Sequence, residues 1–146
     1  EDISIIAESK NIKIETKIES NVIVPIDAPR IHQALLNLLD NAVKYTPRGG
    51  RVALYLQKNS EYVELIVEDN GIGIPKEDVP YIFDRMYRVD KARASDIQGA
   101  GLGLSIVKWI VESHHGTITV QSEVNKFTRF IVNLPLQHPQ ENEPQT

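Results

Sequence analysis

The chain has 146 residues, of which 41% are hydrophobic and 25% are charged, with a formal net charge of −4 and no cysteine. This length suits a single domain with its own core. The slightly negative net charge gives no positive potential that would favour binding of a nucleic acid. The lack of cysteine excludes a disulfide framework and a thiolate metal site. No apolar run approaches the length of a membrane span, and no signal peptide is recognised.

The N-terminal part of the chain predicts a helix followed by two strands. Residues 1–10 have a helical pattern that begins abruptly with polar residues, so we expect a fragment of a longer protein. Residues 12–18 alternate isoleucine or threonine with polar residues, which predicts a strand with one buried face. Residues 22–24 are apolar and precede Pro25, which predicts a short edge strand because proline has no amide to donate.

A helix predicted from Ile31 to Tyr45 is the central element of the sequence. It follows Asp27, which is typical of an N-cap, and Pro29, which is favoured in a first turn. The turn residues 46–50 end it. Its apolar residues recur at helical spacing and form one stripe for a core, namely Ile31, Leu35, Leu38, Leu39 and Ala42.

Asn37, Asn41 and Lys44 form a polar face on the same helix. They recur at i, i+4 and i+7, so at about 100° per residue they lie roughly opposite the apolar stripe. Two amides and an amine in this arrangement suit a metal ion with phosphates, and they also suit a plain solvated surface. The helix alone leaves both interpretations open.

Two strands, 52–57 and 62–67, follow and predict a β-hairpin with its turn at Asn59-Ser60. The second strand runs into residues 68–75, with the sequence EDNGIGIP. Asn-Gly is a common hairpin turn, but the proline and the charged residues after it predict no returning strand. Gly71 and Gly73 are therefore predicted to let the backbone approach another group closely, with Asp69 offering a carboxylate at the end of the strand.

The connection 76–100 is long, charged and weakly periodic, and it contains an aromatic patch at 82–88. A connection of this length with little regular structure is typical of a functional loop or a linker. The aromatic residues and Met86 favour a lid. Phe83, Met86 and Tyr87 suit either the core of that lid or a docking surface.

A glycine-rich stretch, 99–104, opens a helix predicted over 102–113, and free amides at a helix start favour an anion. The stretch matches neither a P-loop nor a dinucleotide fingerprint. Gly116 is predicted to end this helix. Strands at 117–122 and 127–134 and a polar tail at 137–146 complete the chain.

Four motifs in this order and spacing resemble the catalytic ATP-binding domain of sensor histidine kinases, one of the GHKL ATPases. Residues 37–45 resemble the N box, 69–73 the G1 box, 83–88 the F box and 99–104 the G2 box. The resemblance covers about Ile12 to Pro135. It implies an α/β two-layer sandwich with helices on one face of a mixed β-sheet, a domain at 1–136 and a tail at 137–146.

The resemblance also implies roles for particular residues. Asn41 would hold Mg²⁺, with Asn37 on the same face, while Lys44 would contact phosphate and Tyr45 would lie beside the nucleotide. Asp69 would accept a hydrogen bond from the adenine amine, which favours adenine over guanine.

Further roles fall on the lid and the glycine-rich stretch. Arg88 would reach the γ-phosphate, with Arg85 a weaker candidate, and Gly101 and Gly103 would form the hinge of the lid. The catalytic residues implied are Asn41, Lys44 and Arg88. The residues implied to bind ATP are Asn37, Asn41, Lys44, Tyr45, Asp69, Gly71, Gly73, Ile74, Tyr87, Arg88, Gly101, Leu102, Gly103, Leu104 and Thr128.

By the same resemblance, the chain uses ATP and Mg²⁺ and donates the γ-phosphoryl group to a histidine on a separate dimerisation domain. Asn37 stands where hydrolytic relatives have a glutamate, and a neutral amide is a poor general base, which favours transfer over hydrolysis. The domain is expected to be monomeric and cytoplasmic. Its parent is expected to be a homodimer, with or without a membrane anchor, that signals to a response regulator.

Two other functions stay open: a non-catalytic nucleotide-binding or docking module, and a serine kinase of the anti-sigma-factor type on the same fold. Ala100 and His115 are mild departures from the family pattern. Asn125 and Phe127 stand near positions that usually hold glycine, before Thr128. Their presence predicts a stiffer or reshaped last hairpin and an altered nucleotide affinity.

Overall fold

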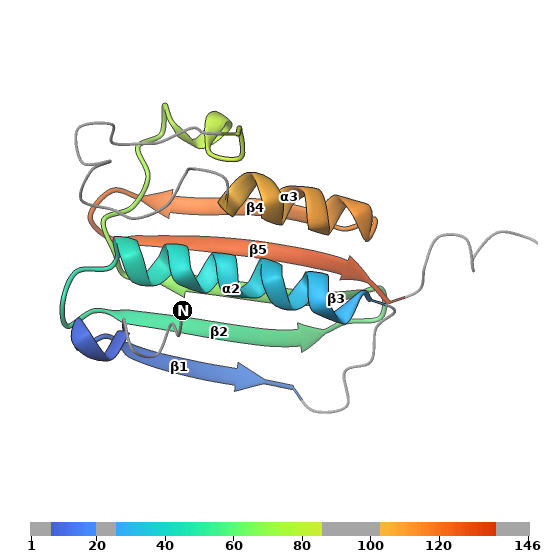
Figure 1. The fold of residues 1–146 in the computed structure, drawn as a ribbon, viewed down its shortest axis with the longest axis horizontal. Coiled ribbons are helices and arrows are strands. Elements are labelled where there is room, and N and C mark those ends of the chain that lie inside the picture. Colours follow the sequence, from blue (N-terminus) through green and yellow to red (C-terminus); the bar gives the residue numbers. More distant parts are fainter. Residues whose placement is uncertain (1–6, 20–25, 86–102, 137–146) are drawn as a thin grey trace, which may run out of the picture.

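The computed structural model describes residues 7–19, 26–85 and 103–136, which contain one sheet, the two helices α2 and α3, and short helical segments such as residues 7–9 (Figure 1). The five strands lie in the order β1-β2-β3-β5-β4. Their bounds are β1 Lys13–Ile18, β2 Arg51–Lys58, β3 Tyr62–Asp69, β4 Thr117–Glu123 and β5 Phe127–Pro135. The sheet is mixed, because β1 is parallel to β2 and the other pairs are antiparallel.

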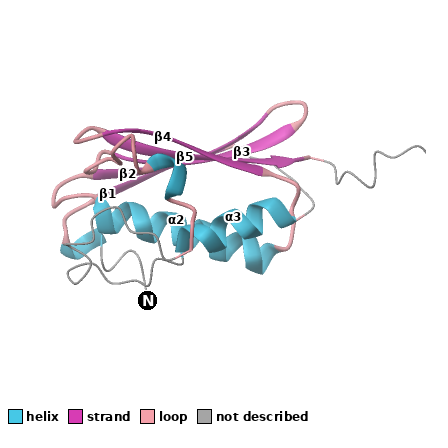
Figure 2. Ribbon diagram, turned by 90° about the horizontal axis from the view of Figure 1, so that it is seen from above, coloured by secondary structure: helices cyan, strands magenta, loops and turns pink. Residues whose placement is uncertain are grey.

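The helices α2 (Ala28–Tyr45) and α3 (Gly103–Ser113) cover the same face of the sheet, as Figure 2 shows. They lie side by side and antiparallel, with α2 over β2 and β3 and α3 over β4. This arrangement confirms the predicted two-layer sandwich. Within the described parts of the chain, the helices are too short or too polar to span a membrane.

The core fills the space between the helices and the sheet. Its fully buried side chains include Leu38 and Val43 of α2, Ile110 of α3 and Phe130 of β5. Alternate residues of β5 are buried, as the sequence predicted for Phe130, Val132 and Leu134. The helical and two-residue periodicities therefore meet in one hydrophobic cluster.

The central helix ends at Tyr45, as predicted, and begins at Ala28, three residues before the start that the apolar periodicity indicated. The predicted N-cap, Asp27, is confirmed. The Asp27 carboxylate accepts a hydrogen bond from the Arg30 N–H at 3.3 Å, and proline follows within the first turn. Thr46 ends the helix in an extended conformation. Local capping residues thus fix both ends of α2.

The strand at 12–18 forms as predicted, but the prediction that one of its faces is buried is wrong. Ile14 is 37% exposed and Ile18 is 58% exposed, and only Ile12, just before β1, is buried. The reason is position: β1 is an edge strand, and α2 packs on β2 and β3 instead. Alternation predicts which side chains share a face, and tertiary packing decides whether that face is covered.

The prediction that Gly116 ends the last helix is also wrong in detail. The residue in the left-handed conformation is His115, with φ 62°. The His115 N–H donates to Glu112 O at 3.0 Å and the Gly116 N–H donates to Val111 O at 3.0 Å, which is a Schellman motif. Glycine is required at 116 for another reason, because a Cβ atom there would lie 2.4 Å from Asn133 O.

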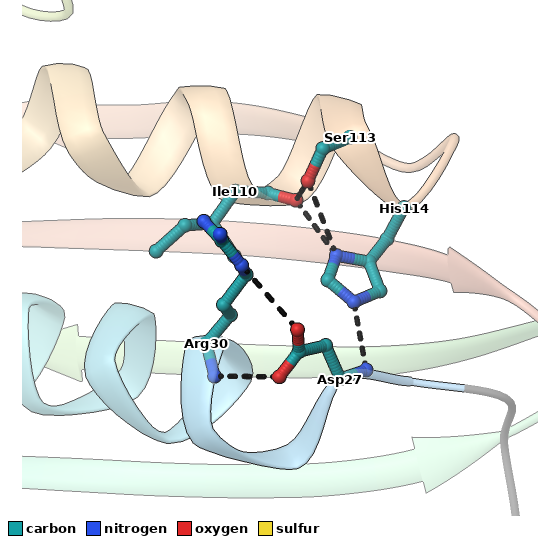
Figure 3. Close-up of polar contacts among 5 residues, drawn as sticks. All are labelled: Asp27, Arg30, Ile110, Ser113 and His114. Atoms are coloured by element: carbon teal, nitrogen blue, oxygen red, sulfur yellow. Dashed lines mark hydrogen bonds and ion pairs between the residues drawn. The ribbon is translucent and has the colours of Figure 1, made fainter.

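A histidine connects the end of α3 to the start of α2 (Figure 3). One ring nitrogen of His114, Nδ1, lies 2.8 Å from Ile110 O, and the other, Nε2, lies 2.9 Å from the Asp27 amide nitrogen. Since a carbonyl only accepts and an amide N–H only donates, Nδ1 carries the proton and Nε2 accepts. Arg30 completes this contact: it pairs with Asp27 at 3.3 Å and lies 4.9 Å from the centre of the Trp109 ring.

Several predicted elements lie partly or wholly outside the described residues: residues 1–6 of the helix predicted over 1–10, the edge strand at 22–24, residues 86–100 of the predicted lid and the tail at 137–146. The described residues 7–9 are helical, as predicted. The described part of the lid, up to residue 85, contains one 3₁₀ turn, η1 (Val79–Tyr81). Ile82 is buried after it, and Phe83 packs edge-on against Phe130, with 6.1 Å between ring centres. Phe83 therefore belongs to the domain core.

Candidate functional site

The buried polar side chains of the described residues lie at one end of the sheet. They are Thr46, Asp69 and Thr128. Asp69 is the last residue of β3, and Thr128, the second residue of β5, is its partner in the strand register. Thr46 follows the last residue of α2. Buried polar groups are unusual in a core, so this cluster is the candidate site.

Asp69 is the acidic residue of this cluster and is 5% exposed. Its Oδ1 accepts a hydrogen bond from the Gly71 N–H at 2.8 Å. Burial raises the pKa of Asp69 to about 6; the Gly71 hydrogen bond lowers it and the neighbouring Glu68 charge raises it slightly. At neutral pH the side chain is mostly a carboxylate, which accepts hydrogen bonds and does not donate them.

The two glycines after Asp69 allow close packing, as the sequence predicted, and the group approached is the chain's own backbone. A Cβ atom on Gly71 would lie 2.4 Å from Tyr45 O, and one on Gly73 would lie 2.3 Å from Glu123 O. Gly73 also has φ 74°, which favours glycine. The Ile72 N–H donates to Tyr45 O at 3.2 Å. The loop is thus held against the end of α2.

The turn between β4 and β5 holds the same loop from the other side. The Asn125 N–H donates to Ile72 O at 2.8 Å, and Ser122 Oγ accepts from the Ile74 N–H at 2.8 Å. Ser122 Oγ also lies 2.9 Å from Phe127 O and 3.0 Å from Thr128 Oγ1. One hydroxyl therefore connects the glycine loop to the threonine that faces Asp69.

Asn125 occupies the left-handed position of that turn, with φ 62°. Asparagine tolerates this conformation better than most residues, so the hairpin closes although glycine is absent. The Phe127 ring lies under the Arg129 guanidinium, 5.1 Å from its centre. The predicted change in nucleotide affinity stays a prediction.

The polar face of α2 lies on the same element as the buried Thr46 end. Asn37, Asn41 and Lys44 are each half-buried. Lys44 Nζ lies 3.0 Å from Asp40 Oδ2, an ion pair between residues one turn apart. The structure connects this face to the Asp69 cluster through Tyr45, whose carbonyl oxygen binds the glycine loop.

The glycine-rich stretch is described only from its last glycine onward. Gly103 begins α3, and a Cβ atom there would meet no other atom within 4 Å. Leu104 packs partly buried against the core. Arg85 is exposed. The predicted site residues Tyr87, Arg88, Gly101 and Leu102 lie outside the described residues, as does Ala100.

Two residues that sequence reasoning missed support this site, namely Ser122 and Lys10. Lys10 Nζ donates to the carbonyl oxygens of Val43 and Lys44, at the end of α2. Neither residue belongs to a recognisable motif, and both act on partners far away in sequence. A serine in a strand and a lysine at a helix end are common, so the sequence contained no signal that distinguished them.

Among the described residues, no group of three or more histidine, cysteine, aspartate or glutamate side chains is placed to hold a metal ion. A divalent ion at this site would depend on amide oxygens, on water and on the ligand's own oxygens. That donor set suits Mg²⁺, which keeps several waters and bridges phosphates.

Comparison with known proteins gives three findings. Residues 26–138 match the family described as histidine kinase-, DNA gyrase B-, and HSP90-like ATPases. The sensor histidine kinase YclK of Bacillus subtilis is 43% identical over 133 residues, which cover 89% of this chain and 28% of YclK. Among solved structures, the mycobacterial sensor histidine kinase MprB superposes with a TM-score of 0.79 at 33% identity, over 91% of this chain and 90% of that one.

A third relative was solved with a ligand. Full-length ShkA in complex with AMPPNP superposes with a TM-score of 0.77 at 31% identity. The match covers 93% of this chain and 28% of ShkA. This chain therefore spans only about a quarter of the length of YclK and of ShkA.

Proposed function

Because the chain belongs to the histidine kinase-, DNA gyrase B-, and HSP90-like ATPases, we propose that it is the ATP-binding catalytic domain of a sensor histidine kinase. It donates the γ-phosphoryl group of ATP to a histidine on a separate dimerisation domain. The observation that carries the proposal is the buried Asp69 carboxylate, set between a strand end and a glycine loop that packs on α2. The identity with YclK, a sensor histidine kinase, supports the same conclusion.

Asp69 is the residue that selects adenine. Its carboxylate accepts a hydrogen bond from the exocyclic amine of adenine, whereas guanine has a carbonyl oxygen at that position and is repelled. Thr128, paired with Asp69 in the sheet, lies beside the base. The AMPPNP in ShkA, a ligand with an adenine base, is consistent with this assignment.

Asn41 and Asn37 hold Mg²⁺. They lie one turn apart on α2 and offer neutral amide oxygens, the type of ligand that a hard cation accepts along with water and phosphate oxygens. When bound, the ion neutralises charge on the phosphates. A half-buried position suits this role, because the side chains are held in place and still reach solvent.

The remaining groups position the phosphates. Lys44 contributes a cation whose place on α2 is set by its ion pair with Asp40. The first amides of α3, from Gly103, favour the negative charge of the phosphates. We assign Arg88, which lies outside the described residues, to the γ-phosphate. Transfer of a phosphoryl group depends mainly on such positioning and charge neutralisation. Asn37 provides no general base for water, which favours transfer over hydrolysis.

We infer the wider assembly from the resemblance to sensor histidine kinases. YclK is a sensor histidine kinase, and about three quarters of it lies beyond the matched segment. We assign residues 1–136 to the catalytic domain and 137–146 to a tail. The parent protein is a homodimer with a histidine-bearing domain, this domain itself is a cytoplasmic monomer, and the signal passes to a response regulator.

Calorimetric titration with ATP and GTP, each with and without Mg²⁺, tests the proposal. We expect binding of ATP in the micromolar to millimolar range, preference over GTP, and stronger binding with Mg²⁺. Asn41→Ala should remove the Mg²⁺ effect and leave adenosine binding unchanged. The absence of ATP binding at millimolar concentration would favour the docking-module alternative instead.

A positive titration would be followed by a transfer assay. The chain is mixed with the histidine-bearing domain of its parent, Mg²⁺ and ATP labelled at the γ-phosphate. Label on a histidine confirms the proposed reaction, whereas label on a serine of a small partner protein would support the serine-kinase alternative.

A further inference from the structure

The last turn of α2 presents four carbonyl oxygens that the helix cannot satisfy by itself. Thr46 Oγ1 donates to Ala42 O at 2.7 Å, and the Ile72 N–H donates to Tyr45 O at 3.2 Å. The two oxygens between them both bind the ammonium group of Lys10, which comes from the segment before β1. Lys10 is thus the partner of half of this helix end.

Lys10 is well suited to hold a helix terminus. Its Nζ lies 2.8 Å from Val43 O and 3.1 Å from Lys44 O, and a cation there also meets the negative end of the helix dipole. Partial burial lowers the pKa of Lys10, a sign that its ammonium group has lost part of its water. The Gly49 N–H donates to Lys10 O at 2.9 Å, so the residue also holds the turn after α2.

The segment that presents Lys10 is itself fixed. Ala7 is buried in the core. The Ile12 N–H donates to Ala7 O at 2.8 Å and the Asn11 N–H donates to Glu8 O at 3.0 Å, with Asn11 at φ 55°. These two hydrogen bonds form a Schellman motif, a common C-terminal cap, after the helical residues 7–9. The ammonium group therefore reaches α2 from an ordered backbone.

We propose that Lys10 is a positioning residue for the ATP site: its ammonium group fixes the last turn of α2 and, with it, the side chains of Asn41 and Lys44. The inference rests on the proposed function, because those two side chains are assigned there to Mg²⁺ and phosphate. Lys10 acts through α2 and does not contact the nucleotide. Without the ammonium group, the last turn frays and the phosphate-binding face loses its geometry.

The test compares three variants of this chain. Lys10→Met keeps the length of the side chain and removes its donors, while Lys10→Arg keeps donors that reach the same carbonyls. Lys13→Met is the matched control, because Lys13 is an exposed residue of β1 that pairs with Glu15 at 3.5 Å. Two properties are measured: the affinities for MgATP and adenosine, and hydrogen exchange of the α2 amides without nucleotide.

We expect Lys10→Met to weaken MgATP binding about tenfold and to leave adenosine binding within about twofold. Asp69 belongs to β3, which is paired with β2 and β5, whereas Asn41 and Lys44 lie at the end of α2 that Lys10 binds. Amide exchange should become faster in the last turn of α2 in this variant alone. Lys10→Arg and Lys13→Met should stay within about threefold of wild type. This pattern separates positioning of the phosphate face from a general loss of stability.

Three results would overturn the proposal: an unchanged MgATP affinity in Lys10→Met, an equal loss of MgATP and adenosine binding, or a loss in Lys10→Arg as large as in Lys10→Met. A wild-type chain that binds no MgATP would instead contradict the proposed function. The exchange data need no nucleotide, so they report separately whether Lys10 holds the end of α2.

Discussion

Asp69 is a single residue at which function and stability oppose each other. Its pKa rises from 3.8 to about 6 in the folded protein, so the native state binds a proton more tightly than the unfolded chain does. Stability from this group is therefore highest below about pH 4 and is lost as the pH rises through 6. At pH 7 the ionised carboxylate destabilises the fold by about 3 kcal/mol, from about 1.4 kcal/mol per pKa unit.

Asp69→Asn should stabilise the fold and weaken ATP binding. The amide oxygen keeps the hydrogen bond from Gly71, while the amide nitrogen presents donors to the adenine amine. We expect the free energy of unfolding in urea to increase by about 1–3 kcal/mol at pH 7 and by much less at pH 4, with ATP affinity reduced about tenfold to a hundredfold.

The control for this prediction is Glu112→Gln, which removes an exposed carboxylate from α3. In this control, the change in the free energy of unfolding should be the same at pH 4 and at pH 7, and the affinity for ATP should equal that of wild type. If Asp69→Asn destabilised the protein at pH 7, the argument that burial of this charge destabilises the fold would be wrong. If the variant bound ATP as well as wild type, the assignment of Asp69 to the adenine would be wrong.

His115 is a second residue with a measurable local strain. It is not glycine, yet it adopts φ 62° at the end of α3. A left-handed conformation costs about 1–2 kcal/mol for such a residue, and glycine avoids most of this. His115→Gly should therefore increase the free energy of unfolding by about 1 kcal/mol. His115→Ala retains the strain, so equal stability of the two variants would contradict the explanation.

At the scale of elements, the β4–β5 hairpin fixes the glycine loop on which the Asp69 site depends. Ser122→Ala removes the acceptor of the Ile74 N–H and the hydrogen bond to Phe127 O, both partly buried. We expect a loss of about 1–2 kcal/mol in unfolding free energy and a weaker affinity for ATP. Chemical denaturation and calorimetry measure both effects.

Ser60→Ala serves as the control for the hairpin, because it removes a hydroxyl from the exposed turn between β2 and β3. It should leave ATP affinity unchanged. If Ser122→Ala bound ATP like Ser60→Ala, the hairpin would stabilise the fold without shaping the site.

At the scale of the whole molecule, local periodicity predicted the elements, and tertiary contacts decided how they are used. The hairpin of β2 and β3 and the two helices appeared close to their predicted bounds, because their spacing depends only on near neighbours. The insertion of β5 between β3 and β4 depends on pairing across the chain, which spacing does not encode. The exposure of Ile14 has the same origin, because the alternation of apolar and polar residues does not tell whether a strand lies at the edge of the sheet.

The candidate site was predictable to the same extent. Asp69 and its glycines stood out because a carboxylate and two glycines at a strand end are unusual. The groups that those glycines approach, the end of α2 and the β4–β5 turn, were not predictable, because they come from distant parts of the chain. Lys10 was missed for this reason, since it binds a carbonyl oxygen 33 residues away.

His114 offers a test of how the helix layer is held together, because it joins two residues 87 positions apart at the ends of α2 and α3. In His114→Ala, the Asp27 N–H loses its acceptor, so the hydrogen bond between the end of α3 and the start of α2 is lost while the fold is retained. We expect the free energy of unfolding to fall by about 1 kcal/mol, and hydrogen exchange at the Asp27 amide to become faster. His32→Ala is the control, since His32 is exposed on α2. Equal exchange at Asp27 in both variants would mean that packing of α2 and α3 on the sheet, and not this contact, sets the position of the helix start.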